Sequence, residues 1–369
     1  MFTSLEMDQY RGFRHYRVGR LARVNLLVGR NNCGKTSILE AIHLLASNAD
    51  PEVLAQIAER RGEMLASAPA RHGYRVETTL TPTCAHFFHG HDFPGSSEFS
   101  IWADGDGSRR STTVAVARES EQEPGKPAGA GSGGPSLYIA SKPEKPQRSI
   151  VPLTDEGALV GVKPTLPGRQ GRAGSKNGPP VVFLTPDSLM PPSMSDMWNE
   201  VVKERRESEV IDAMRILEPD LDDIFFESGD TAFSSGRPAG ILAGFRGMQR
   251  RVPLGSQGEG MRRILAIALA LIQARGGLLL IDEIDTGLHY SIMGDMWRLV
   301  IEAAQRSGVQ VFATTHSLDC VRGLAWLCDN YPSLAGEVCV QKIEPTLEES
   351  VAFGAGELMV AVEQEIEVR

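Results

Sequence analysis

Eight consecutive residues, Gly29 to Thr36, read GRNNCGKT and match the phosphate-binding pattern G-x-x-x-x-G-K-[ST] at every specified position. The glycines let the backbone approach phosphate oxygens, Lys35 can reach the β- and γ-phosphates, and the Thr36 hydroxyl can ligate Mg²⁺. The preceding run Val24 to Val28 is apolar like a buried strand, and Ser37 to Leu45 has helical apolar spacing. At such a strand-to-helix junction the free N–H groups and the helix dipole favour an anion. The sequence therefore predicts a site for a nucleoside triphosphate with Mg²⁺.

A second candidate site is a pair of carboxylates that follows an apolar run. Leu278 to Ile281 reads as a buried strand and is followed directly by Asp282 and Glu283. Open α/β sheets place ligands at the carboxyl ends of their strands. We expect Asp282 to hold the Mg²⁺ shell and Glu283 to orient or deprotonate an attacking water. The alternative is a strand end that carries two surface acids.

Two further motifs lie on either side of these carboxylates. The run Leu254 to Gly260 (LGSQGEG) precedes an expected helix from Met261 to Ala274, and a small hydroxyl residue with glycines there would form an anion-binding helix N-terminus. The alternative is that Ser256 only caps the helix. The other motif, TTHS, follows an expected strand from Val309 to Ala313. Its histidine, His316, could contact a γ-phosphate and the attacking water, or be structural.

Composition limits the kind of protein. The chain has 369 residues, 41% of them hydrophobic, and a formal net charge of −9. No apolar run approaches the ~20 residues that span a bilayer, and the N-terminus lacks the apolar region of a signal peptide. Five cysteines include no C-x-x-C pair, which indicates neither a zinc site nor a disulfide framework. We therefore expect a cytoplasmic protein without a membrane partner, whose acidity leaves room only for a local basic patch.

Strands and helices alternate at both ends of the chain, which predicts a mostly parallel sheet. Residues 119–136 and 164–180 are rich in Gly, Pro and Ser and are expected to be flexible loops. A helical block is expected from Met194 to Leu217. We therefore expect residues 1–118 and 240–369 to form a nucleotide-binding core, and 119–239 to form a partly flexible insertion with a helical arm. Further expected helices are 51–64, 292–304, 318–327 and 355–366, and further expected strands are 74–80, 98–103, 137–140, 149–153, 181–184, 223–226, 240–245, 250–254 and 339–343.

The order of the phosphate-binding loop, LGSQGEG, LLLIDEID and TTHS resembles the ABC-type ATPases of the SMC/RecF group. Within that group the chain is most similar to the bacterial AAA_15 and AAA_21 ATPases, which are related to the ATPase half of OLD-family proteins. The resemblance covers nearly the whole chain. It implies an α/β P-loop NTPase with an ABC-type ATPase head, in which a mostly parallel central sheet is joined by an antiparallel subdomain and a helical insertion.

The resemblance also implies a role for each motif. Asp282 corresponds to the Walker B carboxylate and Glu283 to the catalytic base, with Thr36 and Asp282 on the metal and His316 as the switch histidine. Ser256 and Gly258 lie in the signature loop and Asp285 in the D-loop. The Walker A residues that would hold ATP are Gly29, Arg30, Asn31, Asn32, Cys33, Gly34, Lys35, Thr36 and Ser37.

The sequence departs from the transporter branch of these ATPases in three ways. Its signature reads GSQGE where transporters typically have SGGQ. No Q-loop glutamine can be assigned, since Gln122 and Gln147 lie in or near low-complexity sequence. The candidates for an aromatic residue that stacks on adenine fit the core equally well; they are Tyr10, Phe13 and Tyr16.

The function expected from the resemblance is Mg²⁺-dependent hydrolysis of ATP to ADP and phosphate by a homodimer that forms head to head on ATP binding. Only 53 residues follow His316, so no Toprim nuclease is expected, and a separate effector or nuclease chain would serve DNA repair or anti-phage defence. DNA could bind a local basic patch, although a solvated charged face explains each candidate equally well. The candidates are Arg11, Arg14, Arg17 and Arg20, or Lys203, Arg205 and Arg206. Alternatives are a nucleotide switch with negligible turnover and a transporter subunit.

Overall fold

A computed structural model describes residues 1–66, 70–72, 75–77, 80–91, 98–118, 134–142, 147–162, 178–186, 191–227 and 240–364. Its centre is a six-stranded sheet in which five neighbouring strands are parallel and the last is antiparallel. The strand order is β12 (Val181–Leu184), β16 (Leu278–Ile281), β17 (Gln310–Thr314), β3 (Val24–Val28), β18 (Val338–Lys342) and β19 (Val351–Gly354). Strand β17 therefore lies between β3 and β16.

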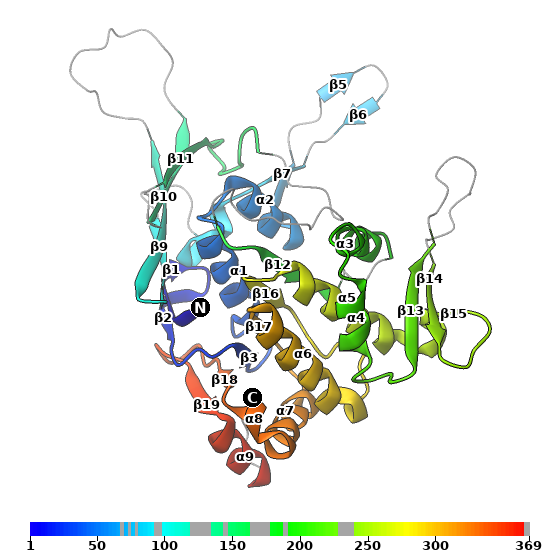
Figure 1. Ribbon diagram of the computed structural model, residues 1–369. Coiled ribbons are helices and arrows are strands. Elements are labelled where there is room, and N and C mark those ends of the chain that lie inside the picture. The colour runs from blue at the N-terminus through cyan, green and yellow to red at the C-terminus, as the bar shows by residue number, and fades with distance from the viewer. Residues whose placement is uncertain are drawn as a thin grey trace, which may run out of the picture.

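Side chains of the central sheet alternate between two cores because successive residues of a strand point to opposite faces. Leu26 and Val28 join one core, which also contains α5 (Glu259–Gln273), α6 (Met293–Ser307) and α7 (Leu318–Asn330), whereas Leu27 joins the other. That second core contains α1 (Lys35–Ala46) and α2 (Pro51–Arg60). Figure 1 shows α1 and α2 on one side of the central sheet and α5, α6 and α7 on the other. Both faces of the sheet are thus covered by helices.

A second six-stranded sheet, antiparallel throughout, packs outside α1. Its order is β11 (Gln147–Pro152), β10 (Pro135–Lys142), β9 (Ser108–Arg118), β8 (Glu98–Gly105), β1 (Phe2–Tyr10) and β2 (Phe13–Val18). Its inward side chains, such as Leu5, Met7, Phe99 and Ile101, belong to the same core as α1. The result is a layered head: antiparallel sheet, helices, parallel sheet, helices.

An arm extends from the head on the side of α5 (Figure 1). It consists of α3 (Pro191–Lys203), α4 (Glu207–Met214) and the antiparallel strands β13 (Leu221–Phe226), β14 (Ile241–Phe245) and β15 (Val252–Pro253). Trp198 stacks on Phe226 with ring centroids 5.3 Å apart, which joins the helices to the strands. The remaining elements are β4 (Met64–Ala66), β5 (Ala70–His72), β6 (Arg75–Glu77), β7 (Leu80–Pro82), η1 (Ala85–Phe87), η2 (His89–His91), η4 (Leu254–Gln257), η5 (Tyr290–Ile292), α8 (Pro332–Ala335) and α9 (Ala355–Glu363).

The predicted α/β P-loop architecture is confirmed, with differences in detail. Strands β1, β2, β4, β5, β9 and β19 were not predicted, and the helix expected over 51–64 ends at Arg60. The single strand expected over 74–80 includes residues outside the described ones, and 75–77 and 80–82 form separate strands. The two Gly/Pro-rich stretches lie largely outside the described residues. Among those described, no helix is long and apolar enough to cross a membrane.

The expected insertion, residues 119–239, contributes to both sheets. Strands β10 and β11 extend the antiparallel sheet, and β12 pairs with β16 in the central one. Among the described residues of this range, 191–227 belong to the arm, which β14 and β15 complete. The division of the chain into core and insertion stays a prediction.

Candidate nucleotide site

The phosphate-binding loop connects β3 to α1, at the junction that the sequence predicts. Gly29 and Gly34 have φ angles of 145° and 98°, in the region that favours glycine. A Cβ on Gly29 would lie 2.7 Å from the Ile343 carbonyl oxygen, and one on Gly34 would collide with the Phe13 ring. No side chain caps the N-terminus of α1. The loop is therefore closely backed by protein on one side, and the first N–H groups of the helix have no intrahelical acceptor.

The lysine of this loop folds back over it. Lys35 Nζ donates hydrogen bonds to the carbonyl oxygens of Gly29 at 2.7 Å and Arg30 at 2.9 Å. An ammonium held on neutral carbonyls can exchange them for phosphate oxygens, which form stronger, charge-assisted hydrogen bonds.

Residues at the carboxyl ends of β16 and β17 lie next to this loop, which itself follows β3. Thr36 Oγ1 lies 3.2 Å from both carboxylate oxygens of Asp282, at the end of β16. Thr314, at the end of β17, donates to the same carboxylate at 2.6 Å. These oxygens are the ligand type that Mg²⁺ prefers. Since a threonine hydroxyl and a carboxylate already lie side by side, the residues fit a magnesium ion.

Glu283 lies beside His316 at the edge of the site. His316 Nδ1 is 3.6 Å from Glu283 Oε1, and Thr286 donates to Glu283 Oε2 at 3.3 Å. Both the glutamate and the histidine side chains are about half exposed, at 46% and 56%. The backbone of Glu283 is left-handed, with φ at 50°, and its N–H donates to Thr314 Oγ1 at 2.8 Å. The carboxylate is thus held at the edge of the site and remains open to solvent.

Asp285 lies in the turn after β16 and accepts a 2.6 Å hydrogen bond from Thr315. The backbone N–H of Ile284 donates to the Thr314 carbonyl at 3.0 Å. These two hydrogen bonds join the turn after β16 to the end of β17, in addition to the bond from the Glu283 N–H to Thr314 Oγ1.

Arg263, which sequence reasoning missed, braces the turn after β16 from behind. It is fully buried in α5 and donates to the backbone carbonyls of Asp282, Glu283 and Ile284 at 3.0, 2.7 and 3.3 Å. Burial lowers its pKa to about 10, against the opposing effect of the nearby carboxylates. The available signal was a charged residue inside an almost wholly apolar helix.

The signature loop lies apart from the phosphate-binding loop of its own chain. Among the described residues, no hydrogen bond or ion pair links residues 254–260 to residues 29–37. Ser256 Oγ donates to the Pro253 carbonyl at 2.6 Å, and the residue that precedes α5 is Gly258, with φ at 102°. Capping of α5 by Ser256 is therefore excluded. The N-terminus of this long helix has no side-chain cap.

The aromatic candidates for adenine stacking lie in the core. Tyr10, Phe13 and Tyr16 have exposed fractions of 0%, 4% and 1%. The structure therefore supports their role in the core over stacking on adenine. Burial raises the pKa of Tyr16 to about 12, and the Tyr16 hydroxyl accepts a hydrogen bond from the Glu344 N–H.

The first proposed basic patch is largely neutralised. Arg11 is buried, with Nε 2.9 Å from Glu40 and Nη1 2.7 Å from Glu63. Arg17 pairs with Glu349 and Arg20 with Glu357, both at 3.3 Å. Including Arg11 in a DNA-binding face was wrong, because its side chain is an internal ion-pair partner of the helix that follows the phosphate-binding loop.

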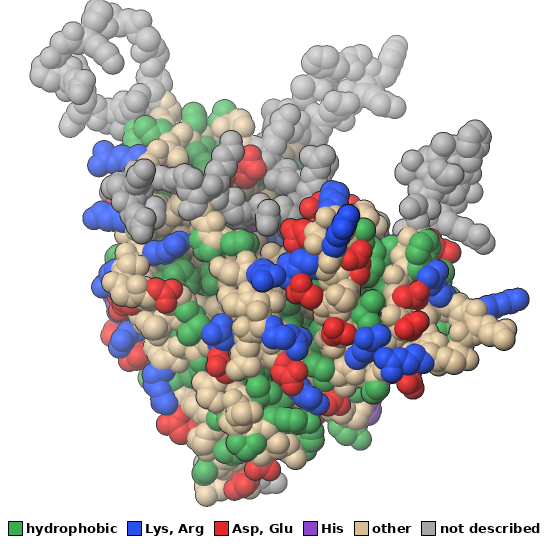
Figure 2. Space-filling model, in the orientation of Figure 1, with side chains coloured by type: hydrophobic (Ala, Val, Ile, Leu, Met, Phe, Trp, Pro, Cys, Tyr) green, Lys and Arg blue, Asp and Glu red, His purple; other side chains and the backbone are tan. Residues whose placement is uncertain are grey.

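The second proposed patch lies on the arm. Lys203 pairs with Glu200 at 2.6 Å, and Arg206 with Glu209 at 2.8 Å. Figure 2 shows basic and acidic side chains intermixed over this face. The arm therefore presents alternating charge in place of a continuous basic surface.

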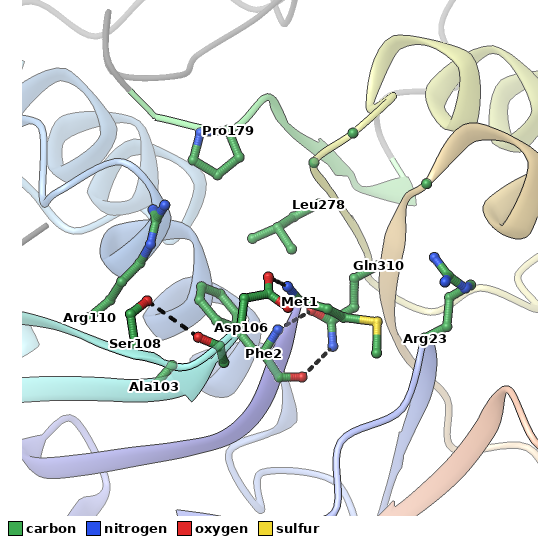
Figure 3. A pocket seen from close by; sticks show the side chains of 14 residues that line it. Met1, Phe2, Arg23, Ala103, Asp106, Ser108, Arg110, Pro179, Leu278 and Gln310 are labelled. Atoms are coloured by element: carbon green, nitrogen blue, oxygen red, sulfur yellow. Dashed lines mark hydrogen bonds and ion pairs between the residues drawn. The ribbon is translucent and has the colours of Figure 1, made fainter. Parts of the chain in front are cut away.

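A hollow of about 330 Å³ lies at the opposite ends of the strands (Figure 3). It is bordered by Leu278 and Gln310, the first residues of β16 and β17. The Gln310 side chain closes one wall by exchanging two 2.8 Å hydrogen bonds with the Phe2 backbone. This hollow is distinct from the nucleotide site, which lies at the carboxyl ends of the same strands.

Two families of ATPase domains match parts of the chain. Residues 1–77 match "AAA ATPase domain", and residues 185–319 match "AAA domain, putative AbiEii toxin, Type IV TA system". The first range contains the phosphate-binding loop and the second contains the signature loop, Asp282 and His316. With the P-loop, these matches support an AAA-type ATPase domain, and with it ATP binding and hydrolysis in general.

Individual proteins resemble this chain either over a short range or at low sequence identity. The chain is 36% identical over 64 residues to "Uncharacterized protein MJECL11" of Methanocaldococcus jannaschii, a match that covers 17% of this chain and 56% of that protein. The chain thus spans about half the length of this curated relative. The SMC head domain from Thermotoga maritima is similar in structure, with a TM-score of 0.46, 14% identity and coverage of 96% and 98%. The Smc head domain of Pyrococcus furiosus, bound to the C-terminal domain of ScpA, has a TM-score of 0.48 and 11% identity, and the match covers 99% of both chains.

Proposed function

We propose that this protein binds Mg²⁺–ATP and hydrolyses it to ADP and phosphate. The observation that carries the proposal is the contact between Thr36 Oγ1 and both oxygens of Asp282, at 3.2 Å. Two motifs that are about 250 residues apart in the sequence, each suited to Mg²⁺, meet there. Bound Mg²⁺ would neutralise phosphate charge as the bond to the γ-phosphate breaks.

The chain's own residues would then act in turn. Lys35 leaves the loop carbonyls and binds phosphate oxygens, and the uncapped N-terminus of α1 provides further N–H donors. Glu283 orients a water and takes its proton, since its carboxylate is exposed beside the metal-side Asp282. His316, 3.6 Å from Glu283, contacts the γ-phosphate and keeps the glutamate in place.

The active form in this proposal is a head-to-head homodimer. The N-terminus of α5 is an anion-binding end without a side-chain cap, and it is not connected to the phosphate-binding loop of its own chain. Ser256 and Gly258 would therefore complete the site of a second copy. A nucleotide bound between two copies makes dimerisation depend on ATP.

The biological role that we propose is DNA repair or anti-phage defence, in which a separate effector or nuclease chain acts on the target. The description of the family matched by residues 185–319 names a toxin of a type IV toxin–antitoxin system, which agrees with defence. The charge distribution limits the contribution of DNA, because the described basic side chains proposed for it are mostly paired with acids. A protein effector is the better candidate partner.

A steady-state phosphate-release assay tests this proposal, with and without Mg²⁺ and with and without DNA. We expect release that requires Mg²⁺ and is lost in Lys35→Ala. Tight nucleotide binding without turnover would instead favour a switch module. Co-purification of the protein with the membrane fraction would favour the transporter subunit.

A further inference from the structure

Two short turns, η1 and η2, bring a pair of histidines together on the surface next to the antiparallel sheet. His86 Nδ1 lies 3.3 Å from His91 Nδ1, with ring centroids 5.3 Å apart and ring planes inclined by 59°. His86 is partly exposed and His91 is exposed, so both rings can be reached from solvent. Nothing in the nucleotide site uses these side chains.

The spacing of the two nitrogens matches metal coordination. Without a metal ion the two nitrogens lie within hydrogen-bonding distance, and a bound cation would replace that hydrogen bond. Two nitrogens at adjacent corners of a tetrahedral Zn²⁺, each about 2.0–2.1 Å from the metal, are separated by roughly 3.3–3.4 Å. We propose that His86 and His91 form a binding site for a dication of the zinc class, with both Nδ1 atoms as ligands.

Water would complete the coordination. Among the described residues, no group of three or more His, Cys, Asp and Glu side chains could hold a metal ion, so the protein provides two ligands here. Imidazole nitrogens suit Zn²⁺, Ni²⁺ and Cu²⁺, whereas Mg²⁺ requires oxygen ligands. The site is therefore chemically distinct from the one that contains Asp282, and the two can be occupied independently.

The turns η1 and η2, which carry His86 and His91, are anchored to the core, and this holds the two rings near each other. Phe87 and Phe88, between the histidines, are buried in the core. Arg11 holds the same segment: its N–H donates to the Phe87 carbonyl at 2.9 Å, and its carbonyl lies 2.9 Å from His89 Nδ1. The two rings therefore start close to the geometry that a shared ligand requires.

Zn²⁺ titrated into the full-length protein by calorimetry tests the site, with millimolar Mg²⁺ present to occupy carboxylates. We expect one Zn²⁺ per chain, and loss or a roughly tenfold or greater weakening of that binding in both His86→Gln and His91→Gln, since loss of even outer-shell partners costs 10–100-fold. Both variants should keep their metal-free melting temperature, because His91 is exposed and His86 is partly exposed. Cobalt substitution should give the intense visible absorption of a tetrahedral site.

Two matched controls separate this site from other histidines. His289→Gln changes another exposed histidine, whose Nδ1 lies 2.9 Å from the Ser291 hydroxyl, and should leave Zn²⁺ binding unchanged. His316→Gln removes the histidine beside Glu283 and should also leave it unchanged. The proposal is overturned if Zn²⁺ binds His86→Gln and His91→Gln as tightly as the native chain, or if His316→Gln alone abolishes binding.

Discussion

The Arg263 guanidinium donates a 2.7 Å hydrogen bond to the backbone carbonyl of Glu283 from inside the protein. The arginine belongs to α5, whose N-terminus carries the signature loop, and the glutamate to the turn after β16. One buried side chain thus connects the loop proposed to serve a second copy with the residue proposed to activate water.

Replacing Arg263 by alanine should both destabilise the protein and slow hydrolysis. The carbonyls of Asp282 and Ile284 would lose their donor, at about 1–3 kcal/mol for each buried group left unsatisfied, whereas the Glu283 carbonyl would keep the N–H of Thr286 at 3.1 Å. Arg263→Lys should recover only part of the loss, since an ammonium cannot reproduce the planar fork of donors. Thermal unfolding and phosphate release measure the two effects. Arg275→Ala, an exposed arginine just beyond the same helix, is the control and should change neither.

Glu283→Gln should bind ATP but turn it over at least about 10²-fold more slowly, the low end for a general base. The amide retains the size of the side chain and its hydrogen bond from Thr286, yet it cannot accept a proton. ATP binding by fluorescence and phosphate release by a coupled assay separate the two steps. An unchanged rate would remove Glu283 from the mechanism.

Ser256→Arg should prevent ATP-dependent dimerisation while leaving nucleotide affinity of the monomer within a few-fold. The new side chain would obstruct the N-terminus of α5, which no hydrogen bond or ion pair among the described residues links to the phosphate-binding loop of its own chain. Light scattering measures the molar mass with and without ATP, and Lys35→Ala and Glu283→Gln are measured in parallel for comparison. Loss of monomer binding would show that the loop acts within one chain or supports the fold.

Asp223 and Arg251 in the arm predict a small, pH-dependent contribution to stability. Hydrogen bonds from Arg251, at 2.5–3.1 Å, hold the pKa of the Asp223 carboxyl below its ordinary value near 3.8. Because the folded pKa is the lower one, the contribution is present above pH 3.8 and is lost as the pH falls through the folded pKa. Asp223→Asn should cost less than about 1 kcal/mol at neutral pH, as both side chains are more than 40% exposed. Urea unfolding of both proteins from pH 6 to 3 should show the difference shrinking; a constant difference would contradict the ion-pair explanation.

The motifs predicted the central sheet well because each marks a strand end. Val24 to Val28 and Leu278 to Ile281 are short apolar runs that are buried on both faces, and each is followed directly by a motif. Pairwise distances could not be predicted, since they depend on β17 lying between β3 and β16. The sequence therefore indicated which residues meet, and the sheet order determines how.

The antiparallel sheet was predicted less completely. Strand β2 (FRHYRV) buries Phe13, Tyr16 and Val18 and exposes charged residues, a pattern with an irregular period. The turn before it needs Arg11 in a left-handed conformation, with φ at 50°, and no glycine marks that position. The charged Arg263 inside an apolar helix could have drawn attention, but its acceptors are backbone carbonyls from another part of the chain, which residue types do not reveal.

The left-handed backbone at Glu283 implies a conflict between folding and activity at this one position. A residue with a side chain pays roughly 1–3 kcal/mol to adopt such a conformation, whereas asparagine tolerates it better. Glu283→Asn should therefore be more resistant to unfolding than Glu283→Gln, although both should hydrolyse ATP much more slowly than the native protein. A search for thermostable variants of this protein would be drawn to the substitutions that disable it.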